Sequence, residues 1–340
     1  MKMNYYRDII FSKSPLTGGY TFKDKFQIFP ASLKNQPTSI YAKDHPIIVE
    51  YALSDEELIT PSYVIEGLEQ FSIETASRVT KVEEIIRLLC TFTNHFFFRY
   101  ESGSGFWGMP IINDNPGKEA NNWSSVWCFK MLFWPDYPKE MKIDSFSEIE
   151  NFVELVPHHP YFFIKPNLDM NPSLEITFPY SFEQFAESYF NSTEVIKSVV
   201  LKAMNHLYNA VDLMYRKQTL SIISAFTSLE TMINEEYKEQ KIEFCEACGQ
   251  PKFKVSKKFK DYLSTYVGQN TSLKKKLNLY YKKRSKIVHT GQELATEDLY
   301  SNLPKSERDS DSITHQEVIQ ITRLGISHWL YKKTRPSKPV

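Results

Sequence analysis

The spacing of apolar residues divides the chain into two parts that predict different structures. From Asn191 onward, apolar residues recur every three or four positions, which is the spacing of helices with one buried face. Before about residue 180, short apolar runs alternate with Pro, Asn and Gly, a pattern typical of strands and turns. The sequence therefore predicts an α+β protein, with a mixed α/β domain over 1–185 followed by an all-α helical bundle over 186–335.

In the C-terminal part, two helix starts carry a pair that resembles a capping box. Asn191 is followed by Glu194, and Thr314 is followed by Glu317, so we expect a helix to begin at each pair. A glycine suited to a helix C-cap, Gly291, ends another segment. The expected helices of an up-and-down bundle are 191–214, 219–237, 257–267, 272–289 and 314–332.

In the N-terminal part, short runs of β-branched and aromatic residues predict strands, and one longer apolar stretch predicts a helix. The helix is expected over 82–97. The glycine-rich segment 103–108 lacks the Lys-Ser/Thr ending of a phosphate-binding loop, so it is interpreted as a turn. The expected strands are 20–30, 47–53, 125–133, 161–165 and 174–178.

Composition adds an expectation about the cell compartment of the protein. The 340 residues contain four cysteines, too few for a disulfide framework, which favours a reducing environment. The N-terminus has no apolar signal core, and no apolar run is long enough to cross a membrane. We therefore expect a cytoplasmic protein that does not bind membranes.

Charge is distributed unevenly along the chain, although its formal net charge is zero. Between residues 251 and 286 there are twelve basic residues and one acidic residue, a local net charge of +11. Such a basic region attracts a phosphate backbone, whereas the alternative interpretation is a solvated helix face. The candidate RNA-binding residues of this region are Lys274, Lys275, Lys276, Lys282, Lys283 and Lys286.

The candidate catalytic pair is Arg284 and His289, at the end of this basic segment. A histidine exchanges a proton near neutral pH, and a guanidinium grips two phosphate oxygens at once. The pairs Arg308/His315 and Arg323/His328 have similar spacing, but they lack the Ile-Val step before the histidine and the glycine after it.

The stretch Tyr280-Tyr281-Lys282-Lys283-Arg284-Ser285-Lys286-Ile287-Val288-His289-Thr290-Gly291 resembles the signature of HEPN-domain ribonucleases, closest to the Apea-like HEPN branch. The resemblance covers about 191–331 and implies a helical bundle and a toxin or anti-phage defence role. It also implies a homodimer whose two Arg/His pairs form a composite site that cuts RNA by 2′-hydroxyl attack, leaving a 2′,3′-cyclic phosphate. No metal is required for that reaction.

Two further residues take site roles by this resemblance. Ser285 stands where active members commonly have Asn, Asp or His, so its hydroxyl is the expected substitute. Glu230 on the second helix is expected either to pair with Arg284 for structural reasons or to line the site. A non-catalytic HEPN module that binds nucleotide, RNA or a protein remains the alternative function.

Cys245 and Cys248 form one Cys-x-x-Cys, half of a zinc knuckle. A structural zinc ion would need two further ligands, from elsewhere in the chain or from a second chain, and unmetallated thiols in a loop are the other interpretation. A zinc-stabilised interaction scaffold is thus a third hypothesis. The N-terminal domain is expected to sense or regulate, with a protein or phage-derived trigger as its partner.

Overall fold

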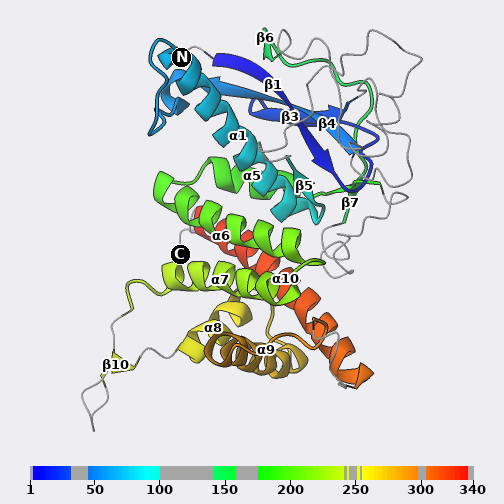
Figure 1. Cartoon of the computed structure of the whole chain (residues 1–340), viewed down its shortest axis with the longest axis vertical. Coiled ribbons are helices and arrows are strands. Elements are labelled where there is room, and N and C mark those ends of the chain that lie inside the picture. Colours follow the sequence, from blue (N-terminus) through cyan, green and yellow to red (C-terminus); the bar gives the residue numbers. More distant parts are fainter. Residues whose placement is uncertain are drawn as a thin grey trace. The chain divides into compact units, whose positions relative to one another are not determined.

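The computed structural model describes residues 3–31, 45–99, 141–157, 175–240, 243–244, 251–252, 255–297 and 304–335. Contacts divide the chain into a first unit, Met1–Val156 with Leu168–Pro179, and a second unit, Pro157–Asn167 with Tyr180–Val340. An antiparallel sheet and helices are both present, so the predicted α+β class is confirmed (Figure 1). The predicted strands 125–133 and 161–165 and the segment 103–108 lie outside the described residues.

The first unit is built on an antiparallel sheet with strand order β2-β3-β4-β1-β5, and β6 pairs with β1. β1 and β4 pair along their whole length and bury Ile9, Phe11 and Val49. The chain turns at Lys23, where φ is 48°, so the predicted strand 20–30 is in fact two strands. The strands are β1 Met3–Ser12, β2 Tyr20–Phe22, β3 Phe26–Pro30, β4 His45–Ser54, β5 Phe97–Phe98 and β6 Lys142–Ile143, with β7 Leu155–Val156 parallel to β8 Phe178–Pro179.

Helix α1 (Glu69–Thr93) is tied to this sheet by ionic and polar contacts. Arg78 donates to the Asp8 carboxylate at 2.8 Å and to the Tyr51 hydroxyl at 3.3 Å. The predicted helix 82–97 has the wrong limits. The prediction starts too late because the first turns of α1 are largely polar and exposed. It ends too late because the left-handed backbone of Asn94 (φ 57°) stops the helix there.

The second unit is helical, as predicted for the C-terminal part, apart from one short strand pair. Two capping predictions are wrong. Asn191 caps the end of α5, and the N-cap of α6 is Thr193. Thr314 lies inside α10, which begins after Pro304. The elements are α5 Phe182–Phe190, α6 Glu194–Leu213, α7 Gln218–Glu236, α8 Val255–Tyr266, α9 Thr271–Thr290 and α10 Lys305–Thr334, with β9 Glu243–Phe244 paired to β10 Pro251–Lys252.

Small residues bring α6 and α7 into close contact. Ser228 on α7 donates its hydroxyl to the Ala203 carbonyl on α6 at 2.6 Å, and Ser221, seven residues earlier, donates to the Ala210 carbonyl. All four residues are fully buried. Because seven residues correspond to nearly two helical turns, the two contacts repeat along one line between the helices.

A half-buried carboxylate on α7 links three helices of the second unit. Glu236 accepts from the Trp329 indole on α10 at 2.8 Å and from the Tyr266 hydroxyl on α8 at 3.0 Å, and Lys333 lies 3.0 Å away. Burial raises the pKa of Glu236, but the bonds from Lys333, Trp329 and Tyr266 outweigh it and hold this pKa below its ordinary value. The carboxylate therefore stays charged near neutral pH.

Stability of the second unit is expected to fall as pH drops below about 6.5, because His315 is buried as the neutral imidazole. Its Nε2 lies 2.7 Å from the Ser221 hydroxyl, and burial lowers the pKa of His315 to about 4, with Glu297 opposing the shift. The unfolded chain takes up a proton near pH 6.5, whereas the folded chain does so only near pH 4. In urea unfolding between pH 7 and 4.5, the native chain should lose on the order of 2 kcal/mol more than His315→Gln. Equal losses in the two proteins would contradict this assignment.

Candidate functional site

The candidate site is carried by α9, whose two ends are set by local signals. The Asn270 side chain accepts from the Leu273 N–H at 2.7 Å and caps the start of the helix. Gly291 adopts φ 67° and donates its N–H to the Ile287 carbonyl at 3.1 Å. The predicted helix 272–289 and its C-cap glycine are therefore confirmed to within one residue at each end.

One face of α9 packs into the second unit and the opposite face is exposed. Leu277, Tyr280 and Ile287 are buried. The exposed residues on the other side recur at intervals of three and four, so they form one continuous line along the helix. We call this line the basic stripe: Lys275, Leu279, Lys282, Lys286 and His289.

Arg284 lies on the packed side of α9 and contacts α7. Its Nε donates to the Glu230 carboxylate at 2.8 Å, and the two side chains are 19% and 31% exposed. Among the described residues, no hydrogen-bond partner occupies its two terminal nitrogens. The structure thus brings Arg284 and Glu230 together, with the four N–H donors of the two terminal nitrogens left for a ligand.

One chain does not bring Arg284 and His289 together on the same face. Five residues along an α-helix correspond to a rotation of about 140° and a rise of about 7.5 Å. His289 is exposed in the last turn, whereas Arg284 is half-buried against Glu230. Ser285, beside Arg284, is half-buried. A single α9 helix therefore does not present both groups to one phosphate.

Two of the candidate RNA-binding lysines are engaged by acids of α10. Lys276 pairs with Glu317, which also accepts from the Tyr280 hydroxyl, and burial together with this bond raises the pKa of Tyr280. Lys283 lies 2.6 Å from the Asp311 carboxylate, which also accepts from the Ala295 N–H at 2.8 Å. The sequence does not identify these acids as neighbours of the candidate lysines, because they lie far along the chain from them.

The other four candidate lysines are exposed, and the structure describes no ion pair for them. They are Lys274, Lys275, Lys282 and Lys286. Three of the four belong to the basic stripe with His289. Positive charge thus extends along the exposed side of α9 as far as the imidazole, an arrangement suited to a phosphate backbone.

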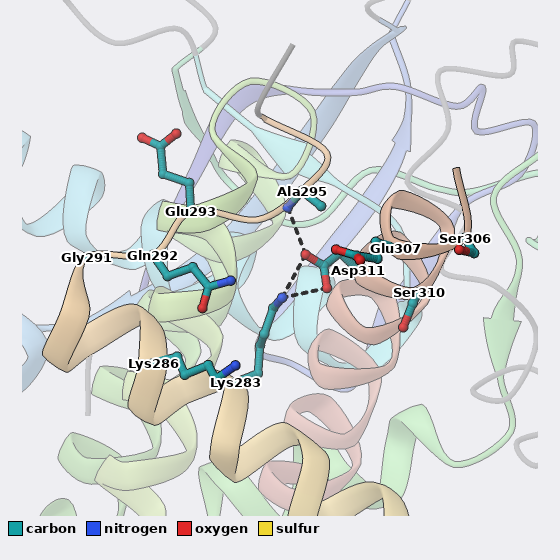
Figure 2. A pocket seen from close by; sticks show the side chains of 10 residues that line it. All are labelled: Lys283, Lys286, Gly291, Gln292, Glu293, Ala295, Ser306, Glu307, Ser310 and Asp311. Atoms are coloured by element: carbon teal, nitrogen blue, oxygen red, sulfur yellow. Dashed lines mark hydrogen bonds and ion pairs between the residues drawn. The ribbon is translucent and has the colours of Figure 1, made fainter. Parts of the chain in front are cut away.

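A cavity of about 690 Å³ opens beside the C-terminal end of α9 (Figure 2). Lys283 and Lys286 come from α9, and the first turns of α10 supply the opposite wall. Arg284 and His289 do not line it. The remaining lining residues are Gly291, Gln292, Glu293, Ala295, Ser306, Glu307, Ser310 and Asp311.

The predicted zinc ligands Cys245 and Cys248 lie outside the described residues. On either side of them, β9 and β10 pair through Phe244 with Pro251 and Glu243 with Lys252. Within the described ranges, no group of three or more His, Cys, Asp or Glu residues is arranged to hold a metal ion. Cys90 is buried, and its thiol contacts the backbone of Phe97. The zinc hypothesis remains a prediction.

The chain matches no protein-family model, no curated protein and no solved structure. The HEPN resemblance therefore rests on the α9 residues and remains a prediction. In the part of the chain that the structure describes, none of the helices is both long and apolar enough to cross a membrane.

Proposed function

We propose that this chain is a metal-independent endoribonuclease of HEPN type, active as a homodimer through α9. The proposal is carried by the surroundings of the two candidate side chains. The imidazole of His289 is exposed on the basic stripe, and the guanidinium of Arg284 is oriented by Glu230 with both terminal nitrogens available. The same proposal includes a cytoplasmic location, which follows from the composition. It also includes a defence role and a trigger that acts through the first unit, which follow from the resemblance.

In the proposed reaction, each group performs a task suited to its chemistry. His289 removes the proton from the 2′-hydroxyl or protonates the departing 5′-oxygen, while the guanidinium of Arg284 stabilises the charge on the phosphorus centre. A single histidine does not easily perform both transfers in one step. Two copies of α9 across a two-fold axis supply two histidines, and this removes the difficulty.

Leu279 is 62% exposed in the middle of the basic stripe, so it offers a second chain an apolar contact on the side of α9 that carries His289. An apolar residue there provides a contact that lysines alone do not, because like charges on two stripes repel. The exposed Lys275, Lys282 and Lys286 then flank the contact and hold RNA.

The proposal is tested by incubating the purified chain with RNA in EDTA and identifying the products. We expect fragments ending in a 2′,3′-cyclic phosphate, and no cut at a position where a single 2′-deoxynucleotide replaces the ribonucleotide, since the attacking hydroxyl is then missing. Cleavage that persists at the 2′-deoxy position would overturn the mechanism. RNA binding without cleavage would instead favour the alternative, a non-catalytic HEPN binding module.

A further inference from the structure

The cavity between the end of α9 and the start of α10 has the size and the polar groups of a ligand site. Its volume of about 690 Å³ falls within the range of about 300–1,000 Å³ that is usual for small-molecule sites. Lys283 is held by Asp311, so these two charges neutralise each other inside the cavity. The charged groups left for a ligand are Lys286, Glu293 and Glu307.

The orientation of these side chains is visible in Figure 2. Lys286 and Gln292 extend toward the space next to Lys283, while Glu293 is directed the other way. Glu307 and Asp311 are four residues apart on α10, so they share one face of that helix. Glu307 is exposed, and no ion pair is described for it. The site thus offers one cation on the α9 side and one free carboxylate on the α10 side.

A nucleotide satisfies both of these groups. An ionised carboxylate only accepts hydrogen bonds, so the ligand must present donors to Glu307, while Lys286 requires an anion. A nucleotide carries both, in its base and its phosphate. Serine hydroxyls at Ser306 and Ser310 and the Gln292 amide add donors for carbonyl oxygens of the base.

Among the four RNA bases, guanine matches a carboxylate best. Its Watson–Crick edge places N1–H and the N2 amine side by side, so the two carboxylate oxygens each receive one hydrogen bond. Adenine and cytosine place a ring acceptor next to their amine, and uracil places its single donor between two carbonyls. These bases leave one carboxylate oxygen unmatched, which costs affinity.

We propose that this cavity is a guanosine-nucleotide site, with Glu307 accepting from the base and Lys286 contacting the phosphate. Lys286 lies in both the cavity lining and the basic stripe, so the bound guanosine would belong to the RNA strand that the stripe holds. By binding a guanosine of the strand, the cavity selects which position of the RNA reaches His289. The assignment of the ligand to RNA rests on the proposed function.

The site is tested by calorimetric titration of the full chain with 5′-GMP, 5′-IMP and 5′-AMP. GMP should bind about tenfold more tightly than AMP, with IMP in between because it lacks only the N2 amine. Glu307→Gln should bring GMP to the affinity of AMP. Asp309→Asn, an equal change of charge at an exposed position of α10 that does not line the cavity, should leave the preference intact.

Three results would each contradict the guanosine site: equal affinities for GMP and AMP, absence of GMP binding, or a preference for GMP that survives Glu307→Gln. The two proposals fail separately. GMP-selective binding in a chain that does not cut RNA supports the site and removes its connection to cleavage. Cleavage without any GMP preference supports the ribonuclease and removes the guanosine site.

Discussion

Replacing His289 with alanine is expected to reduce RNA cleavage by a factor of about 10²–10⁴, the usual contribution of a general acid or base. Because His289 is exposed in the last turn of α9, the free energy of unfolding should change by less than about 0.5 kcal/mol. The measurement is the single-turnover cleavage rate of a labelled RNA, taken together with urea unfolding of the same preparation.

The matched control for this variant is His206→Ala, which removes a half-buried imidazole from α6 in the same unit. It should cleave at the native rate, and RNA affinity should be nearly unchanged in His289→Ala because the lysines of the stripe remain. A His289→Ala protein that cuts at the native rate would remove the imidazole from the mechanism.

The Arg284–Glu230 pair allows structural and chemical roles to be separated by exchanging the two residues. Arg284→Ala should lower the cleavage rate by about 10²–10³, and it should also cost about 1 kcal/mol of stability because Glu230 loses its partner. The double variant Arg284→Glu with Glu230→Arg restores the ion pair with its ends reversed. Its stability should return toward the native value while its cleavage rate stays low, because the guanidinium now projects from α7.

Recovery of cleavage in the exchanged protein would show that the pair acts only by holding α7 against α9. Unfolding midpoints in urea and cleavage rates are therefore both required, along with the Glu230→Arg single variant. That variant places two guanidinium groups together and should be less stable than the exchanged protein.

An element of this fold is predictable from the sequence when the residues that determine it are close together in the chain. The end of α9 was predictable because its cap is local: Gly291 acts on residues within one turn, as Asn270 does at the start of the helix. The first part of α10, 305–313, has no apolar periodicity, and it is stabilised by contacts of Asp311 with Lys283 and Ala295. Such contacts between distant segments leave no periodic pattern in the sequence.

Helix α5 is missing from the predicted helices, and its aromatic residues explain why. Phe182, Phe185 and Tyr189 have the spacing of a helix, but in a short segment after a proline they resemble a strand. All three are buried, and α5 contacts α10. Packing against α10 therefore stabilises a helix in a segment for which the sequence analysis predicts no element.

At the candidate site, the sequence identified the residues of α9 but not their surroundings. Glu230 was considered as a partner of Arg284, and the 2.8 Å contact is present. The engagement of Lys276 and Lys283 by acids of α10 was not foreseen, nor was the cavity beside them. Both arise from how α10 lies against α9, which depends on tertiary packing.

Helix α10 has a practical consequence for finding molecules that bind this protein. Its first turns form a wall of the cavity, while Ile326, Trp329 and Leu330 near its other end lie in the buried interior. A compound that binds against Glu307 thus contacts a helix whose other end is packed in the core of the helical unit. Its binding should appear as a rise in melting temperature that grows with compound concentration, which makes thermal shift a suitable screen.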